Sequence, residues 1–143
     1  MYNLQEGVLD IPAGWEDQSV NVFAPSSGHG AGLSFVITRE ALPAGLSVQD
    51  YGDREIRRMG RETKQFSLLG KHPAEIAGQE VVAYEVRWKS EHGLVHQLMA
   101  AAQVAGRAMI FTATMPGTMT AETRDRMLRL MASFRPYTDA PAG

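Results

Sequence analysis

The sequence DQSVNVF spans residues 17–23, and LSFVIT spans residues 33–38. Both stretches are rich in β-branched and aromatic residues, which predicts β-strands. Successive side chains of a strand point to opposite faces, so a half-buried strand is expected to be apolar on one face only. Both stretches instead carry apolar side chains on both faces. They therefore raise the question of what covers the second face.

The composition predicts one globular domain. The chain has 143 residues, of which 44% are hydrophobic and 21% are charged, a length and balance typical of a single domain with its own core. We expect one domain over residues 1–137 and a flexible C-terminal tail over residues 138–143. The formal net charge of -2 gives no basic footprint for nucleic acid, so no nucleic-acid partner is expected.

Three features of the sequence limit the expected chemistry. The chain has no cysteine, which excludes disulfides and thiolate metal sites. The first residues lack the pattern of a secretory signal, and no apolar run approaches the ~20 residues of a membrane helix. The sequence therefore predicts a cytoplasmic protein that is not itself embedded in a membrane and that has neither a cofactor nor a metal.

Hydrophobic periodicity predicts several strands and two helices. The strands are expected near residues 2–11, 19–24, 33–39, 67–77, 80–89, 94–104 and 107–114. One helix is expected from about Val48 to Gln65 with Ser47 as its N-cap, and the other is expected to start after Thr120 and to stop at Pro136. Because helices do not alternate with strands, we predict an α+β fold, in which two helices pack on one face of an antiparallel sheet of about six to seven strands.

No motif predicts a catalytic site. The glycine-rich stretch PSSGHGAG at residues 25–32 lacks the Lys-Ser/Thr ending of a phosphate-binding loop, which favours a plain hairpin loop. His92 and His96 have the spacing of helical metal ligands, but strand patterns surround them, and we expect both to face solvent. His72 has no evident partner in the sequence, and no GxSxG motif is present. We therefore predict a protein that is not an enzyme and has no catalytic residue.

Alternation divides the quoted strands into two faces. One face is expected to form the core beneath the helices, and it carries Phe23, Phe35 and Ile37 together with Tyr84, Val86 and Trp88 of a later strand. The other face is expected to carry Val20, Val22, Ser34, Val36, Val95, Gln97 and Met99. A contiguous patch of small or flexible apolar side chains usually marks an interaction site. We therefore predict that a partner covers this second face.

The residues that raise the question also carry a resemblance. The run DIPAGWEDQSVNVF at residues 10–23, followed by SFVITR at residues 34–39, resembles the N-terminal signature of the Eag chaperones of type VI secretion. These chaperones are relatives of the DcrB-like and Mog1/PsbP-like α+β domains. The resemblance is specific over roughly the first forty residues, and beyond them only the order of the elements agrees.

The resemblance implies a function and a set of residues. Members of this family are understood to be cytoplasmic homodimers that bind the N-terminal transmembrane segments of PAAR-containing, often Rhs-type, effectors before export. It implies a client-binding groove formed by Val20, Val22, Ser34 and Val36 on the strands, Glu55, Met59 and Thr63 as a wall on the first helix, and Gln97 as a polar contact.

Two other functions fit the same sequence. One is a generic protein-binding module of the Mog1/PsbP type that recognises a folded partner through its loops. The other is a domain that binds a small apolar ligand or a lipid, because an apolar sheet face suits either occupant.

Overall fold

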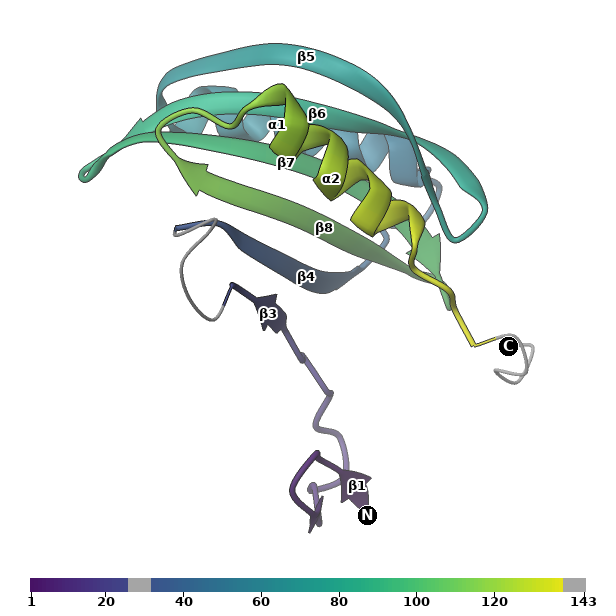
Figure 1. Cartoon of the computed structure of the whole chain (residues 1–143). Helices are drawn as coiled ribbons and strands as arrows, with labels where there is room; N and C mark the ends of the chain where they lie inside the picture. The colour runs from purple at the N-terminus through teal and green to yellow at the C-terminus, as the bar shows by residue number, and fades with distance from the viewer. Residues whose placement is uncertain (26–31, 138–143) are drawn as a thin grey trace.

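The computed structural model of the chain describes residues 1–25 and 32–137 (Figure 1). Most of the predicted glycine-rich loop and the whole predicted tail lie outside these residues. The elements follow one another as β1 (Tyr2–Asn3), β2 (Val8–Leu9), β3 (Asn21–Phe23), β4 (Ser34–Ala41), α1 (Val48–Glu62), β5 (Lys64–Ile76), β6 (Gln79–Ser90), β7 (Gly93–Val104), β8 (Arg107–Pro116) and α2 (Ala121–Ala132).

The main sheet has six antiparallel strands in the order β3-β4-β8-β7-β6-β5, and β1 and β2 form a separate two-stranded sheet. β5 to β8 pair in sequence order as a continuous antiparallel meander. Ala105 and Gly106, which join β7 to β8, both have positive φ, at 53° and 77°, as a two-residue type I′ hairpin requires. The predicted α+β class is confirmed.

Both helices begin where the sequence predicts, α1 after its predicted cap Ser47 and α2 after Thr120. The Ser47 hydroxyl accepts a hydrogen bond from the Asp50 N–H at 3.1 Å and starts α1. The Thr120 hydroxyl accepts one from the Thr123 N–H at 3.1 Å and starts α2. Each cap satisfies a backbone donor that has no partner within its own helix.

The two helices lie on opposite faces of the sheet, which corrects the prediction that both pack on one face. In Figure 1, α2 lies in front of the sheet and α1 behind it. Tyr84 and Val86 pack with Ile56 of α1, whereas Phe35 belongs to the buried cluster that contains Met131 of α2. The predicted single row of phenylalanines with Tyr84, Val86 and Trp88 was therefore wrong. The strand register places Phe35 opposite Ala113, in line with Leu98 and Glu85 rather than with Tyr84.

Small side chains let α2 lie close to the sheet. Beneath it, the sheet presents buried alanines at positions 83, 100, 102 and 113. Met127 and Met131 of α2 fill the space above these alanines together with Phe111 and Leu98. Methionine suits this layer because its unbranched side chain adapts to an uneven floor.

α1 covers only part of the other face. It packs on β5, β6 and β7, where Ile56 meets Tyr84 and Val86. Close approach is possible because Gly52 stands against the Tyr84 ring, where an added Cβ would lie 3.4 Å from Cε2. The strands β3, β4 and β8 continue this face beyond the helix. Among residues 1–25 and 32–137, no helix therefore covers this part of the second face.

The residues before β3 form an arm that leads away from the domain (Figure 1). β1 and β2 pair with each other rather than with the main sheet. The predicted single strand over residues 2–11 is therefore a short hairpin. The arm's exposed apolar side chains include Leu4, Val8, Leu9, Ile11 and Trp15, and Trp15 is 71% exposed.

Candidate functional site: a groove between α1 and the sheet edge

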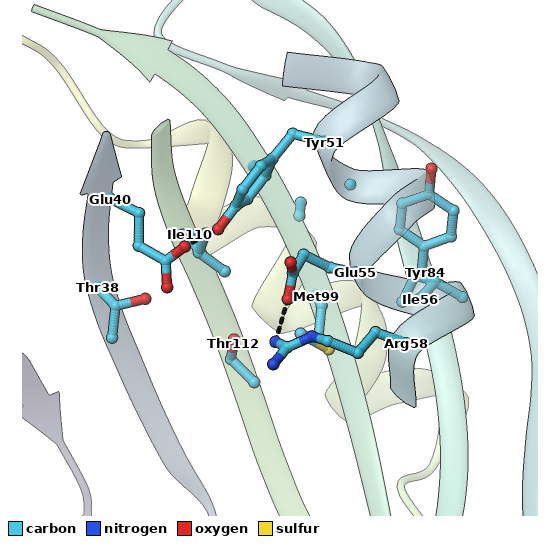
Figure 2. A pocket seen from close by; sticks show the side chains of 13 residues that line it. Thr38, Glu40, Tyr51, Glu55, Ile56, Arg58, Tyr84, Met99, Ile110 and Thr112 are labelled. Carbon is cyan, nitrogen blue, oxygen red and sulfur yellow. Dashed lines mark hydrogen bonds and ion pairs between the residues drawn. The ribbon is translucent and has the colours of Figure 1, made fainter. Parts of the chain in front are cut away.

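A groove runs along the second face between α1 and the outer strands of the sheet. α1 supplies its wall through Tyr51, Glu55 and Arg58, and β4, β7 and β8 supply its floor (Figure 2). The floor side chains of the hollow beside α1 are Thr38, Met99, Ala101, Ile110 and Thr112, and this hollow has a volume of about 200 Å³. Its residue Thr112 pairs with Val36, and Val36 pairs with the exposed Val22 of β3, so the same face extends outward from the hollow as an open trough.

The strand register builds the floor from cross-strand rows. In one row Val22 of β3 pairs with Val36, Val36 with Thr112, and Thr112 with Met99. Directly paired residues on antiparallel strands point to the same face. This row is therefore a band of three apolar side chains and one threonine across four strands.

The neighbouring row is polar. Ser34 pairs with Thr114, and Thr114 pairs with Gln97. Gln97 Nε2 donates to Thr114 Oγ1 at 3.1 Å, and Gln97 Oε1 accepts from the Trp88 indole Nε1 at 2.9 Å. The groove therefore has an apolar floor crossed by a line of hydrogen-bonding groups.

The predicted wall residues of α1 occupy different environments. Glu55 lines the groove and is paired with Arg58, whose side chain extends over the floor near Met99 and Thr112 (Figure 2). Met59 packs against the cluster of Ile56, Tyr84 and Val86. Thr63 is the C-cap of α1, and its hydroxyl donates to the Met59 carbonyl oxygen at 2.7 Å.

Two tyrosines fasten α1 beside the groove. The Tyr51 hydroxyl donates to the Glu40 carboxylate, and the Tyr84 hydroxyl donates to the Asp53 carboxylate. Burial, together with the bond to Asp53, raises the pKa of Tyr84 well above its usual range. Tyr84 therefore stays protonated and remains a donor that holds the helix to β6.

The structure brings the predicted strand residues to one face. Val22, Ser34, Val36 and Gln97 share the groove face by register. Val20 lies just before β3 and is exposed, as is Val22. The sequence interpretation missed the floor residues Thr38, Ile110, Thr112 and Thr114. Their signal was the alternation of threonine and isoleucine with alanine and phenylalanine along β8, but only the register assigns these residues to the groove.

A polar cluster lies on the opposite face, beneath the start of α2, and the sequence analysis missed it. The Glu85 carboxylate contacts His72 Nε2 at 2.8 Å, His96 Nε2 at 2.7 Å and Arg124 Nη1 at 3.5 Å. His96 is 2% exposed, so the prediction that it faces solvent was wrong. The prediction that His72 lacks a partner was also wrong.

Burial raises the pKa of Glu85, but the hydrogen bonds from His72 and His96 and the nearby charge of Arg124 outweigh burial and lower it. The carboxylate therefore stays ionised inside the fold. Within residues 1–25 and 32–137, no group of three or more histidine, aspartate or glutamate side chains has an arrangement that holds a metal ion. No helix in the same residues is long and apolar enough to span a membrane.

Comparisons with known proteins bear on the family. The chain is 34% identical over 92 residues to the protein named Effector EagT6 from Pseudomonas aeruginosa strain PAO1, a match that covers 64% of each chain. A crystal structure of a Pseudomonas aeruginosa protein of unknown function covers 94% of both chains with 26% identity and a TM-score of 0.75. The solution structure of PsbP from Synechocystis sp. PCC 6803 aligns with 13% identity and a TM-score of 0.46.

A match to one protein family covers most of the chain. Residues 6–133 match the DcrB family, a range that includes the main sheet and both helices. Together with the EagT6 match, this confirms the resemblance to the Eag chaperones and their DcrB-like relatives that the N-terminal residues indicated. The chain belongs to the DcrB family.

Proposed function

We propose that this protein is a chaperone or adaptor whose groove binds and shields the N-terminal transmembrane segments of a PAAR/Rhs-type effector before its loading and export by a type VI secretion system. The observation that carries the proposal is the part of the α1 face that no helix of the described residues covers. There, Val22 is 64% exposed and continues through Val36 to Met99 as one cross-strand band. Binding, rather than catalysis, is the activity that we propose.

The driving force is the removal of apolar surface from water. A transmembrane helix in aqueous solution exposes ~20 apolar residues and tends to aggregate. Burial of apolar surface is worth about 25 cal/mol per Å². An open trough of valine, isoleucine and methionine side chains suits a helix that lies along it, and the adaptable methionine allows segments of different sequence to bind.

The similarity to EagT6 supports an effector as the partner. The proposed client is therefore an effector that exposes apolar N-terminal segments in the cytoplasm, where this chain would meet it. The hollow beside α1 has a volume of about 200 Å³, whereas small-molecule pockets usually hold about 300 to 1,000 Å³. This volume argues against an enclosed ligand in this hollow.

The N-terminal arm supports a homodimer as the working form. Residues of the arm expose Ile11 and Trp15 although neither packs in the cores of the domain. An exposed cluster of this kind usually marks a protein interface. A second copy that covers the arm would place two grooves in one particle, which is enough for two membrane segments of one client.

The test uses two adjacent residues of β3 that point to opposite faces. Val22 is on the groove face, whereas Phe23 pairs with Phe35 on the α2 face and is similarly exposed, at 55%. The probe is a soluble carrier protein fused to a model transmembrane segment of about 20 leucine and alanine residues. A second probe carries the N-terminal segments of a PAAR effector encoded beside this chain's gene.

Co-expression with the wild-type chain should keep both probes soluble and should allow them to co-purify. Val22→Asp should abolish co-purification because it places a charge in the apolar floor. Phe23→Asp, the matched control, should leave it intact. Equal loss from both substitutions, or no loss from Val22→Asp, would contradict the proposal.

A further inference from the structure

Three side chains on the groove face form a directed hydrogen-bond chain. Trp88 of β6 donates to Gln97 of β7, which donates to Thr114 of β8. All three are partly buried. The chain runs across three neighbouring strands and ends beside Ser34, which pairs with Thr114 in the register.

The direction of the chain follows from the indole group. A tryptophan Nε1–H can only donate, so it fixes the Gln97 amide with its oxygen toward Trp88 and its nitrogen toward Thr114. Thr114 Oγ1 must then accept from Gln97 Nε2 at 3.1 Å. A hydroxyl that accepts one bond still has a hydrogen to donate. Among the hydrogen bonds of the described residues, Thr114 Oγ1 takes part only as the acceptor from Gln97, and none joins it to Ser34.

We propose that this series of hydrogen bonds presents the Thr114 hydroxyl as a donor to an acceptor oxygen on the bound transmembrane segment. Trp88 is the positioning residue, because its N–H sets the direction of the hydrogen bonds. This inference rests on the proposed function. The inference also changes the role expected for Gln97, which was a polar contact to the client. The amide nitrogen and oxygen of Gln97 both form hydrogen bonds within the sheet, so Gln97 acts on the client through Thr114.

The surroundings of Thr114 favour one kind of acceptor. Its neighbours on the same face include the apolar residues Val36 and Met99. The Thr114 hydroxyl is therefore a hydrogen-bond donor next to apolar side chains. In such surroundings an unmatched donor is costly, and an acceptor that meets it fixes the position of the bound helix. A transmembrane helix offers an acceptor as a Ser or Thr hydroxyl, or as a backbone carbonyl where small residues permit close approach.

The groove provides its own control for this idea. Thr112 lies two residues away on the same strand and face, but it pairs with Met99 and receives no bond from Gln97. Thr114→Val and Thr112→Val therefore remove the same hydroxyl group from similar sites. Only Thr114→Val removes the last hydroxyl of the hydrogen-bond series. Thr114→Ser retains the hydroxyl and should preserve the effect.

The experiment measures affinity for carrier fusions with two model segments of leucine and alanine, one with a central serine and one with alanine in its place. Thr114→Val should weaken binding of the serine probe about two- to tenfold, the usual range for one hydrogen bond. Thr112→Val should weaken it less. If Thr114→Val weakens both probes equally, the acceptor is a backbone carbonyl. If it weakens the serine probe alone, the acceptor is the serine hydroxyl.

A double-mutant comparison of Trp88→Phe with Thr114→Val tests the role of Trp88. Trp88→Phe keeps an aromatic ring but removes the donor, so it should weaken binding about as much as Thr114→Val and should add nothing in the Thr114→Val background. The side-chain NH₂ resonances of Gln97 should shift when the serine probe binds wild type, and this shift should be lost in Trp88→Phe. A merely structural role for Trp88 would instead lower the melting temperature and weaken binding additively.

Failure of this inference differs from failure of the proposed function. If Val22→Asp abolishes binding but Thr114→Val matches Thr112→Val on both probes, the directed chain is refuted and the groove stands. Additive effects of Trp88→Phe and Thr114→Val would also refute it. If wild type binds neither probe, the proposed function fails and this inference fails with it.

Discussion

His96 and Glu85 lie on the neighbouring strands β7 and β6 and share a hydrogen bond of 2.7 Å between Nε2 and Oε2. The other ring nitrogen of His96, Nδ1, accepts from the Met119 N–H at 2.8 Å. His96 is therefore the neutral tautomer that carries its proton on Nε2. Met119 stands just before the N-cap of α2. This pair thus joins the sheet to the start of the helix.

Stability should fall in acid because of Glu85. Its pKa lies below the ordinary value of 4.5 in the folded chain. Between the pKa of Glu85 in the folded chain and its pKa in the unfolded chain, the unfolded chain binds more protons. The contribution of Glu85 to stability is therefore complete above pH 4.5 and is lost as the pH falls through the pKa of the folded chain. Denaturant unfolding from pH 7 to pH 3 should reveal the decline.

Glu85→Gln should flatten that decline. It should also cost about 1 to 3 kcal/mol of unfolding free energy at pH 7, because the amide replaces a buried charged acceptor. Glu62→Gln is the control, since the Glu62 side chain is 62% exposed. If both variants lose stability in acid as steeply as wild type, Glu85 is not the responsible group.

The α2 interface should be sensitive to truncation at one of two adjacent positions. Met131 is fully buried, at 0% exposed, while Leu130 is 44% exposed. Met131→Ala should lower the free energy of unfolding by about 2 to 5 kcal/mol through lost burial and a cavity, and Leu130→Ala by much less. Chemical denaturation with both variants measures the difference. Similar losses of unfolding free energy in the two variants would contradict the packing of α2 in the structure.

α1 offers a stabilising substitution. An added Cβ at Gly60 would lie 3.5 Å from Phe66 Cδ1, an ordinary contact. Gly60→Ala should therefore raise the free energy of unfolding by about 0.5 to 1 kcal/mol through the better helix propensity of alanine. Gly52→Leu should act in the opposite direction, because atoms beyond Cβ would meet the Tyr84 ring. A thermal melt of each variant checks both signs.

Self-association should depend on the arm. Trp15→Ala removes its largest exposed side chain, so it should raise the dimer dissociation constant by about tenfold or more if Trp15 anchors the interface. Tyr137→Ala is the control, because Tyr137 is an exposed aromatic residue outside the arm, at 88%. Sedimentation equilibrium separates the two results. An unchanged constant in Trp15→Ala would refute the arm as the dimer contact.

Local sequence was sufficient for the elements that depend on local physics. The cap Ser47, the start of α2 after Thr120 and the turn at Ala105 and Gly106 were predictable because each depends on the backbone of a few neighbouring residues. Val22 and Val36 were assigned to one face because alternation within adjacent hairpin strands is a short-range pattern. The candidate groove was therefore partly visible before the fold was known.

Register and packing settled the rest. Alternation states which residues of one strand lie together, but it does not state which residues of a distant strand join them. Tyr84 was expected beside Phe35, yet pairing through β8 and β7 puts them on opposite faces. This placed α1 and α2 on opposite sides of the sheet and left a trough beside α1.

The sequence by itself determined the α+β class, the helix starts and the two-faced apolar strands, because these follow from backbone and side-chain preferences within a few residues. Only the tertiary structure decided that His96 meets Glu85 and that Trp88 directs Gln97 toward Thr114. Those contacts join different strands of the sheet. Their geometry depends on the register of a whole sheet, which no short stretch of sequence contains.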